Sequence, residues 1–345
     1  MKKNLRLLSI ILFGLGGCQK SKPLNVPTTA ATPIFTPGPV EAAKPPLKLS
    51  QITHAAKNWK LFLLVPDAKS PFLTPLIMAA RREAKTIGVS LSVNETKSLK
   101  NLPIQNADAL LIVPSVPQLP LLQAIQEKRR RDSIIIAVNA PLEDQYLGSV
   151  GLPVHGFVGP DHHQAGVLVG RAMAKALGKK ASPIFMMTRE FSVKEGQFQS
   201  LQRMNGFVEG LRVTSPYYKH GETSSFGKAA ANASEARNQV YGFRYNDKNL
   251  RGVFASDDEL ALGALDMIKP NEKIFVVGYG ALPSAKKAIQ SGRLLATIEP
   301  NPSITGSNAV RLAVGLLDKR IKGSNTRIVP LSYFTPIKLI QKPKR

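Results

Sequence analysis

Short apolar runs recur along the chain from about residue 59 onward and alternate with stretches of helical periodicity. The first series of runs covers 59–65, 91–93, 109–113, 134–138 and 156–160, and the second covers 183–187, 252–255, 274–278 and 294–298. Continuous apolar strands separated by helices are typical of parallel sheets that are covered on both faces. The two series therefore predict an α/β fold made of two doubly wound parallel-sheet lobes.

Capping residues indicate where the intervening helices begin and end. One helix ends at Gly88, and another begins after Asp161, with Gln164 three residues on, and ends at Gly178. An acidic N-cap and a C-terminal glycine are frequent helix ends. Further helices are expected over 119–131, 197–211, 228–241, 259–268, 283–291 and 304–317, with a strand near Tyr217.

The residues that follow each apolar run are the first place to look for a binding site. In open α/β sheets, ligands bind beyond the carboxyl ends of the strands. The positions concerned are 66–72, 139–140, 188–189, 257–258, 279–280 and 299–300.

The N-terminal residues have the features of an export signal. Lys2, Lys3 and Arg6 precede a short apolar stretch, 7–17, that ends in Leu-Gly-Gly and is followed by Cys18. Such a stretch is too short to span a bilayer, and its ending resembles the bacterial lipobox, whose cysteine is lipid-modified after cleavage. We expect a signal peptide over 1–17 and lipidation of Cys18; the alternative is a cysteine placed there by chance.

Two consequences follow for the rest of the chain. Because Cys18 is the only cysteine, no disulfide within the chain and no cysteine chemistry in the folded part are possible. Residues 18–57 are rich in proline and lack periodicity, which predicts a flexible tether.

The charge balance is the unusual feature of the composition. The 345 residues include 47 basic and 23 acidic ones, a formal net charge of +24, whereas 43% hydrophobic and 20% charged residues are ordinary for a globular protein. Positive charge favours anionic partners, such as nucleic acid, a membrane surface, an envelope polymer or a charged ligand. The alternative is a diffuse solvated charge, since several basic clusters stand where helices should end.

Three consecutive acidic residues, 257–259, follow the apolar run 252–255. Ser256 and Glu259 have the spacing of a capping box, and acidic side chains suit the first turn of a helix. A metal site is disfavoured because no histidine or further carboxylate is placed to complete it. We therefore expect most of this acidic run to be structural.

Several strings taken together resemble the ribose-binding-protein branch of the type I periplasmic sugar-binding proteins, a fold shared with the effector domains of lactose-repressor-type regulators. The strings are SPFLTPLIMAARREAKTIG (70–88), QRMNGF (202–207), VFASDDELALGALDMI (253–268), VVGYG (276–280) and LLATIEPNP (294–302). The resemblance covers about 59–342 and implies two lobes joined by a three-strand hinge. By that template lobe 1 takes 59–160 and 301–330, and lobe 2 takes 161–300 and 331–342.

The resemblance also implies a ligand site between the lobes. Phe72 would stack on the apolar face of a sugar and Ser70 would hydrogen-bond to it, although both residues also suit a helix start with Phe72 in the core. Arg203 falls on the family arginine that binds ligand hydroxyls, although it would also be unremarkable as an exposed helix residue. Asp257 falls on the family's ligand-binding Asn or Asp at a strand end.

Other family positions have changed in this chain. The changes are Asn139-Ala140 for an Asp-Arg pair, Gly280 for an Asp after Tyr279, and Pro300 for a Gln beside Glu299. We count Asn139, Tyr279 and Glu299 among the candidate ligand-binding residues. A pentose would nevertheless lose several of its usual partners here.

The sequence therefore predicts a lipid-anchored solute-binding protein of the cell envelope, facing the periplasm or the extracellular surface. It would trap a sugar or a sugar derivative, anionic ones included, and present it to an ABC permease or a membrane sensor. The alternative is a cationic envelope lipoprotein that binds an anionic polymer and has a degenerate ligand cleft.

Other classes of function are disfavoured. Neither Gly-x-Gly-x-x-Gly nor Gly-x-Ser-x-Gly occurs in the folded region, so we expect no dinucleotide cofactor and no enzyme. A repressor that binds nucleic acid needs an N-terminal helix-turn-helix, and the signal peptide and tether take that position. The adjacent His162 and His163 point about 100° apart on a helix and cannot easily share a metal ion.

Overall fold

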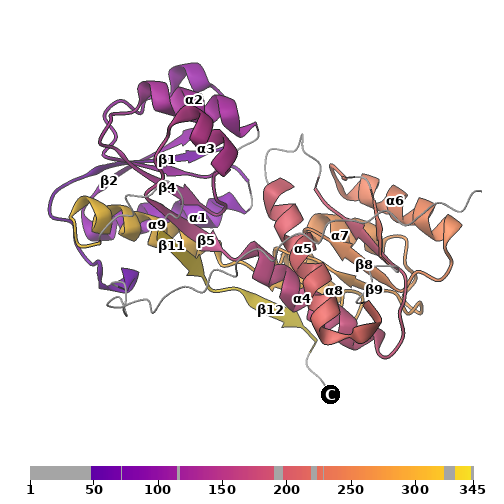
Figure 1. Ribbon diagram of the computed structural model, residues 1–345. Coiled ribbons are helices and arrows are strands. Elements are labelled where there is room, and N and C mark those ends of the chain that lie inside the picture. The colour runs from indigo at the N-terminus through magenta and orange to yellow at the C-terminus, as the bar shows by residue number, and fades with distance from the viewer. Residues whose placement is uncertain are drawn as a thin grey trace, which may run out of the picture. The chain divides into compact units, whose positions relative to one another are not determined.

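The computed structural model describes residues 48–70, 72–114, 117–189, 197–218, 224–227, 229–321 and 331–342. Two six-stranded sheets flanked by helices form the two lobes of an α/β fold (Figure 1). The predicted signal peptide, Cys18 and the tether as far as residue 47 lie outside the described residues. Among the helices that are described, none is long and apolar enough to cross a membrane.

The first lobe is built on a parallel sheet with the strand order β11-β5-β4-β3-β1-β2. Its strands are β1 (Lys60–Val65), β2 (Ser90–Glu95), β3 (Ala109–Ile112), β4 (Ile134–Val138), β5 (Gly156–Pro160) and β11 (Leu331–Thr335). Its helices are α1 (Leu73–Ile87), α2 (Gln118–Lys128), α3 (Asp144–Val150) and α9 (Pro302–Leu317), with 3₁₀ turns η1 (Leu49–Gln51) and η2 (Leu99–Asn101). This is the doubly wound arrangement that the first series of apolar runs predicts.

The second lobe repeats this plan with the strand order β12-β10-β9-β8-β6-β7. Its strands are β6 (Ile184–Met187), β7 (Ser224–Phe226), β8 (Gly252–Ala255), β9 (Phe275–Val277), β10 (Ala296–Glu299) and β12 (Lys338–Gln341). Its helices are α4 (His162–Leu177), α5 (Gln197–Thr214), α6 (Ala233–Asn246), α7 (Asp258–Leu265) and α8 (Pro283–Gln290), with the 3₁₀ turn η3 (Pro216–Tyr218). The edge strand β12 is antiparallel to β10, whereas the other pairs are parallel.

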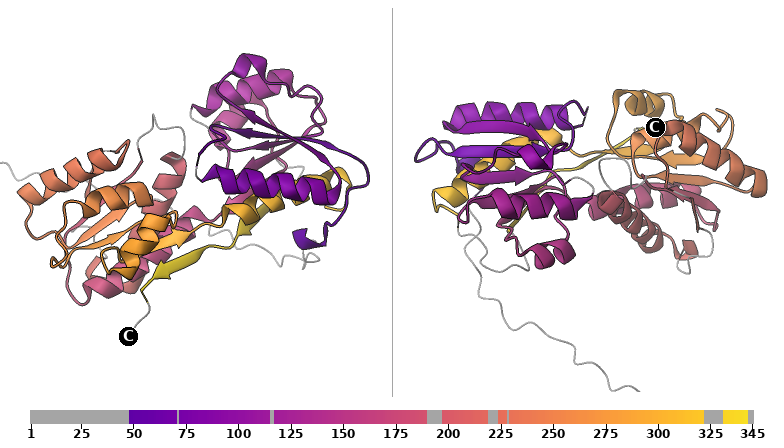
Figure 2. Two further views of the ribbon diagram at one scale, coloured as in Figure 1. Left: turned by 180° about the vertical axis from the view of Figure 1, so that it is seen from behind. Right: turned by 90° about the horizontal axis from the view of Figure 1, so that it is seen from above.

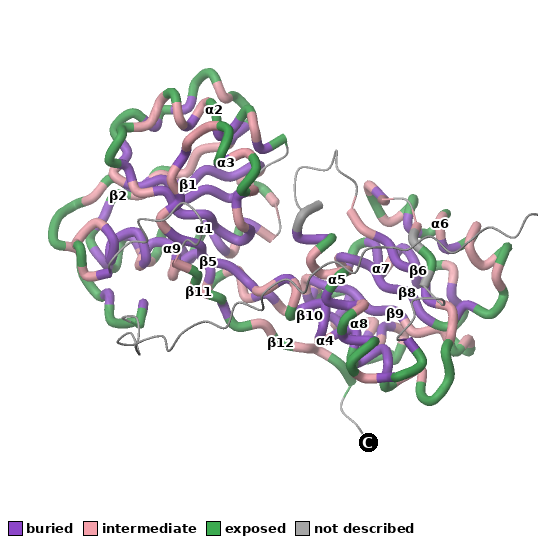
Figure 3. The backbone as a smooth tube through the Cα atoms, viewed as in Figure 1, coloured by how far each residue is buried: buried purple, intermediate pink, exposed green. Residues whose placement is uncertain are grey.

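Helices cover both faces of each sheet (Figure 2), and successive residues of the central strands pack on different helices, so both faces of each sheet carry a core. In β1, Leu61 and Leu63 pack with α1 and α9, whereas Leu64 packs with α2 and α3. In β6, Met187 packs with α6, α7 and α8, whereas Met186 packs with α4 and α5. Alternation of side chains across a strand requires this division. The central strands are accordingly buried along most of their length (Figure 3).

Three segments pass from one sheet to the other: β5 to α4, β10 to α9, and β11 to β12. The last of these corrects a predicted boundary. We expected 331–342 to belong to the second lobe, but Leu331–Thr335 pairs with β5 of the first sheet and only Lys338–Gln341 pairs with β10 of the second. The strand pattern alone does not show that the chain completes one sheet before it crosses to the other.

The predicted tether also ends earlier than residue 57. Leu49 and Ile52 are 6% and 0% exposed and belong to the core formed with α1 and α9. The indole nitrogen of Trp59 donates a hydrogen bond of 2.7 Å to Asp318, and the backbone N–H of Ala56 donates one of 3.1 Å to the same carboxylate. Residues 48–57 are therefore part of the first lobe, because two apolar side chains in a short turn are enough to anchor them.

Two local predictions differ from the structure, and one short helix was not foreseen. The segment near Tyr217 is the 3₁₀ turn η3 rather than a strand, and β7 follows it. The helix expected over 228–241 begins at Ala233, because the side chain of Asn232 caps it by accepting a hydrogen bond of 3.0 Å from the backbone N–H of Glu235. The short helix α3 was not predicted.

Candidate functional site

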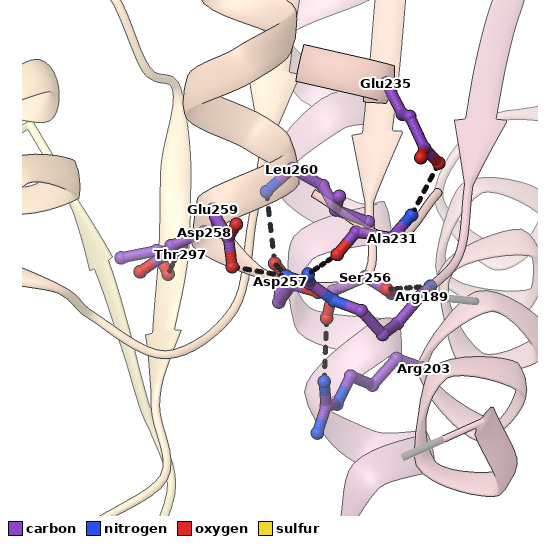
Figure 4. A network of polar contacts seen from close by, with 10 residues as sticks. All are labelled: Arg189, Arg203, Ala231, Glu235, Ser256, Asp257, Asp258, Glu259, Leu260 and Thr297. Atoms are coloured by element: carbon purple, nitrogen blue, oxygen red, sulfur yellow. Dashed lines mark hydrogen bonds and ion pairs between the residues drawn. The ribbon is translucent and has the colours of Figure 1, made fainter. Parts of the chain in front are cut away.

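Polar side chains gather where the strands of both sheets end, the place where ligands bind in this type of fold. They come from the ends of β4, β6, β8 and β9 and from helices α4 and α5. Part of the group is drawn in Figure 4. We call it the strand-end cluster, and its members are Asn139, His162, Arg189, Arg203, Ser256, Asp257 and Tyr279.

Arg203 of α5 makes the contacts that connect this cluster. Its Nη1 donates a hydrogen bond of 2.7 Å to the backbone oxygen of Ser256, and its Nε donates one of 3.3 Å to Nδ1 of His162. The guanidinium carbon lies 3.5 Å from the centre of the Tyr279 ring, a cation–π arrangement. Burial lowers the pKa of Arg203, but an arginine at this depth remains charged.

His162 connects Arg203 to the first lobe. It is 5% exposed, and its Nε2 lies 2.9 Å from the backbone oxygen of Asn139. A carbonyl oxygen only accepts, so Nε2 carries the proton and Nδ1 is free to accept from Arg203. Burial, followed by the charge of Arg203, holds the pKa of His162 well below its ordinary value. The ring is therefore neutral, and both of its nitrogens are already used by the protein.

The neighbouring histidine has a different role. The Nε2 of His163 lies 3.3 Å from the carboxylate of Glu209 on α5. His162 and His163 thus have separate partners. No group of three or more His, Cys, Asp or Glu side chains suited to a metal ion occurs among the residues with described positions.

Two polar atoms of the strand-end cluster are buried and find no partner of hydrogen-bonding geometry among the residues with described positions. They are Oδ1 of Asn139 and the hydroxyl of Tyr279. Asn139 also has a φ of 69°, in the left-handed region that asparagine tolerates better than most residues. Burial raises the pKa of Tyr279 to about 12, so its hydroxyl keeps its proton at neutral pH. Buried polar groups without partners are uncommon in native proteins, and a ligand is one explanation for them.

Arg189 and Asp257 form the most strongly paired part of the cluster. The Nε of Arg189 donates 2.9 Å to Oδ2 of Asp257, and its Nη2 bonds both Oδ1 of Asp257 and the more exposed carboxylate of Glu259. Its Nη1 donates 2.7 Å to the backbone oxygen of Ala231. Burial alone would lower the pKa of Arg189, but the two carboxylates outweigh it and raise that pKa. The sequence indicated that position 189 follows a strand, but no motif marked Arg189 as a binding residue.

The predicted capping box of Ser256 and Glu259 is wrong. The N-cap of α7 is Asp257, whose Oδ1 accepts a hydrogen bond of 3.1 Å from the backbone N–H of Leu260. The hydroxyl of Ser256 instead accepts from the backbone N–H of Arg189 at 3.0 Å. The spacing misled us because Ser and Asp both serve as N-caps, and the backbone is still extended at Asp257, with φ −151° and ψ 169°, so the helix begins one residue later than a cap at Ser256 would require.

Asp258 is the structural acid of the run. It is 1% exposed and accepts hydrogen bonds of 2.6 Å from the hydroxyl of Thr297 and 2.8 Å from the backbone N–H of Leu282. Burial raises its pKa to about 6 despite these bonds. Gly280 lies beside this carboxyl and has a φ of +130°, which L-residues rarely adopt. The family Asp that Gly280 replaces would therefore be strained in this loop.

Close packing of α4 on α5 determines where Arg203 lies. A Cβ added to Gly206 would lie 1.9 Å from the backbone oxygen of His163, and one added to Gly166 would lie 2.0 Å from the backbone oxygen of Arg203. Only glycine allows the two backbones to approach this closely. The glycine in QRMNGF therefore brings Arg203 and His162 within reach of each other.

Three predicted site residues are not joined to the strand-end cluster. The backbone oxygen of Ser70 accepts from the N–H and the hydroxyl of Thr74 at the start of α1, and Phe72 packs against the first-lobe core. The carboxylate of Glu299 is 2.6 Å from Nζ of Lys286. No contact of the described residues links these three side chains to Arg203.

A cavity of about 620 Å³ adjoins the cluster at His162. Glu143, Phe157 and Phe334 of the first lobe and Gln202 of the second are among its walls. The rings of Phe157 and Phe334 meet edge to face at 5.9 Å, and Phe334 is 61% exposed. Its volume and its mixture of aromatic and polar walls suit a small molecule. Gln202 stands beside Arg203 in QRMNGF, which is the only signal that pointed to this wall.

Comparison with known proteins gives curated relatives that match this chain over most of its length. The chain is 24% identical over 286 residues to the ribose import binding protein of Haemophilus influenzae, covering 80% of this chain and 90% of that protein. It is 20% identical over 307 residues to the D-allose-binding periplasmic protein of Escherichia coli, covering 85% and 93%.

Solved structures show the same fold. An ABC transporter solute-binding protein from Actinobacillus succinogenes with bound D-allose has a TM-score of 0.65 at 19% identity, covering 82% of this chain and 98% of the other. A periplasmic ribose ABC transporter protein from Conexibacter woesei has a TM-score of 0.66 at 18% identity, covering 84% and 93%. The sequence profile of the periplasmic binding protein domain matches residues 61–321. This chain therefore belongs to the periplasmic binding protein domain family.

Proposed function

We propose that this protein binds a small polyhydroxylated solute, a sugar or a sugar derivative, at the strand-end cluster. The observation that carries the proposal is a pair of buried polar atoms, Oδ1 of Asn139 and the hydroxyl of Tyr279, which make no hydrogen bond of good geometry with the described residues, although Arg203 lies beside Tyr279. They follow strands of different sheets, and His162 touches both residues: it bonds the backbone oxygen of Asn139, and its ring centre lies 5.7 Å from that of Tyr279. A ligand hydroxyl would satisfy such atoms from both lobes at once.

Arg203 would supply the charged hydrogen bonds to this ligand, as the resemblance to the family implies. Its guanidinium is already oriented by His162, Ser256 and Tyr279, so little side-chain entropy is lost on binding. Asp257 would contribute through a remaining acceptor position, because Arg189 and the α7 cap take the others. Ser70, Phe72 and Glu299 stay predicted contacts that a closed, ligand-bound form would have to bring in.

The related proteins make a sugar the first class to test. The relatives named above bind or import ribose or allose, and the family implies a location outside the cytoplasm. Delivery to an ABC importer, or to a membrane sensor, is the corresponding role for this chain. The identity of the sugar has to be found by experiment, because Ala140, Gly280 and Pro300 replace side chains that contact ribose in the family.

Calorimetry on the purified full chain tests the proposal. Mass spectrometry first identifies small molecules that stay bound to the protein through purification and guides the choice of ligands. The protein is then titrated in turn with ribose, allose, other sugars, sugar acids and sugar phosphates. We expect one hydroxylated ligand to bind well and ribose to bind poorly. Tight ribose binding would refute the effect assigned to the three replacements. No binding by any hydroxylated compound, and none carried through purification, would refute the proposed function.

A lipid anchor at Cys18 is the second part of the proposal. It is supported by the basic residues, the short apolar stretch and Leu-Gly-Gly-Cys, which occur in that order before a proline-rich segment. Such an anchor would keep the binding domain at the membrane that holds its permease. Metabolic labelling with a fatty-acid probe tests this: we expect label in the wild type and none in Cys18→Ser, and equal labelling would contradict it.

A further inference from the structure

A second concave surface lies at the opposite end of the second sheet from the strand-end cluster. It is a groove of about 1010 Å³ formed where α6 and α7 end and where the chain enters β8, β9 and β10. We call it the basic groove. The strand-end cluster follows the carboxyl ends of the strands, whereas the groove precedes their amino ends, so the two sites are separated by the length of the sheet.

The groove is strongly cationic. Six basic side chains line it, against two acidic ones, Asp266 and Glu272. Two of the basic residues have a structural role. Arg293 donates hydrogen bonds of 2.6 and 2.8 Å to the backbone oxygens of Leu265 and Ile268, and Arg244 bonds the backbone oxygen of Met267 and the carboxylate of Glu272. Arginines at a helix C-terminus satisfy carbonyls that have no partner in the helix.

The lysines of the groove have no such structural role. Lys248, Lys269 and Lys273 are exposed, and their ammonium groups form no ion pair or hydrogen bond with the residues the structure describes. Lys269 bonds Glu272 through its backbone alone, and Arg244 already holds the carboxylate of Glu272. Three like charges around one concave surface repel one another, and an anion bound between them would relieve that repulsion.

Two exposed tyrosines stand beside these lysines. Tyr241 and Tyr245 lie one turn apart on α6 and are 59% and 77% exposed, and the buried Leu250 and Ile268 line the same groove. Exposed aromatic rings with a polar tip are typical of binding surfaces, and their faces pack against the apolar faces of sugar rings. Neither the helix cap nor the sheet core explains why both rings remain in solvent.

We infer that the basic groove binds an anionic glycan, a polysaccharide chain that carries carboxylate or phosphate groups. Lysines would pair with the acidic groups and the tyrosines would stack on the sugar rings. A concave surface suits a narrow chain better than the flat surface of a bilayer. The location outside the cytoplasm that the family implies disfavours nucleic acid. This inference is independent of the solute proposed for the strand-end cluster.

Binding of the full chain to polygalacturonate tests the inference. We expect salt-sensitive binding, with weak or no binding to the neutral polysaccharide dextran. Replacing Lys248, Lys269 and Lys273 together by Gln should weaken binding about tenfold or more, since three charged contacts are lost. The matched control replaces Lys85, Lys179 and Lys180 by Gln, exposed lysines elsewhere on the protein, and should change affinity less than about threefold. Equal losses in the two triple variants would mean diffuse charge and overturn the inference.

The tyrosines separate a glycan from a simple polyanion. The variant Tyr241→Ala with Tyr245→Ala should weaken binding to polygalacturonate but leave binding to inorganic polyphosphate, which has no rings, unchanged. Unchanged glycan binding would overturn the stacking role. Preferential binding to phosphatidylglycerol vesicles or to a DNA oligonucleotide over polygalacturonate would overturn the choice of a glycan. Thermal unfolding at the wild-type midpoint confirms that each variant is folded.

Discussion

Arg189 and Asp257 form a two-bond ion pair that joins the end of β6 to the start of α7, with Nε of the arginine 2.9 Å from Oδ2 of the aspartate and Nη2 bonded to Oδ1. The same Oδ1 accepts the backbone N–H of Leu260 and caps the helix. Three of the roughly four acceptor positions of this carboxylate are then used inside the protein. Asp257 therefore stabilises the site before it meets any ligand.

The two carboxylates that contact Arg189 should differ in their effect on stability. Asp257→Ala should lower the free energy of unfolding by about 1–3 kcal/mol, because it removes an N-cap and leaves Arg189 without its main partner. Glu259→Ala is the control and should cost less than about 1 kcal/mol, since the Glu259 side chain is 52% exposed. Urea unfolding measures both values. A larger loss of unfolding free energy in Glu259→Ala than in Asp257→Ala would instead support the capping box of Ser256 and Glu259.

The close contact of α4 and α5 should not tolerate a methyl group. Gly206→Ala should lower the free energy of unfolding by about 1–3 kcal/mol or more, because the added Cβ would clash with the backbone of His163. A backbone atom cannot move away by a rotamer change as a side chain can. Gly242→Ala, in α6, is the control: its Cβ meets nothing within 4 Å, so the variant should be stabilised by about 0.5–1 kcal/mol. Thermal and urea unfolding report both. Equal effects at the two positions would contradict the packing argument.

Burial of Asp258 should make stability fall as the pH rises from about 4 to about 6. The pKa of Asp258 is raised from 3.8 to about 6 in the fold, so the folded protein binds more protons than the unfolded chain in this window. Stability then decreases with pH by on the order of 3 kcal/mol, and this contribution is constant above the folded pKa. Asp258→Asn, which has nearly the same shape, should lack it. Unfolding of both proteins between pH 4 and 7 gives the difference; parallel profiles would show that the carboxyl does not titrate in this range.

Arg203 and Tyr279 should affect ligand binding in separable ways, once a ligand of the proposed class is in hand. Arg203→Ala should weaken binding by about 10- to 150-fold, the range for a hydrogen bond to a charged group. Tyr279→Phe keeps the ring under the guanidinium and removes a hydroxyl that makes no hydrogen bond of good geometry with the described residues, so its free energy of unfolding should stay the same or rise by up to about 1 kcal/mol.

Ligand affinity distinguishes the role of the Tyr279 ring, which supports Arg203, from that of its hydroxyl, which would bond the ligand. If the ligand bonds its hydroxyl, Tyr279→Phe should weaken binding about tenfold while leaving the fold intact. Arg171→Ala removes an exposed arginine of α4 that makes no contact with the strand-end cluster among the described residues, and it should leave affinity unchanged. Calorimetry on the three variants decides. Unchanged affinity in Arg203→Ala would refute its assignment to the site.

Much of the architecture could be predicted because it depends on short-range pattern. Apolar runs such as 134–138 are long enough to be buried on both faces, and Asp161 and Gly178 mark the ends of α4 as expected. Predictions failed where a local signal had two readings. Ser256 and Asp257 are both good N-caps, and the turn at Tyr217 has strand-like composition.

The amino-acid order determined the two series of strands, the helices between them and the positions at which polar residues follow a strand, because these depend on periods of two and 3.6 residues. Contacts between distant segments were decided by the tertiary structure. The bond from Arg189 to Asp257 spans 68 residues and that from His162 to Asn139 spans 23, and neither leaves a periodic trace. The grouping of Lys248, Lys269 and Lys273 arises likewise from where α6 and α7 end against the sheet, since only folding brings helix ends together.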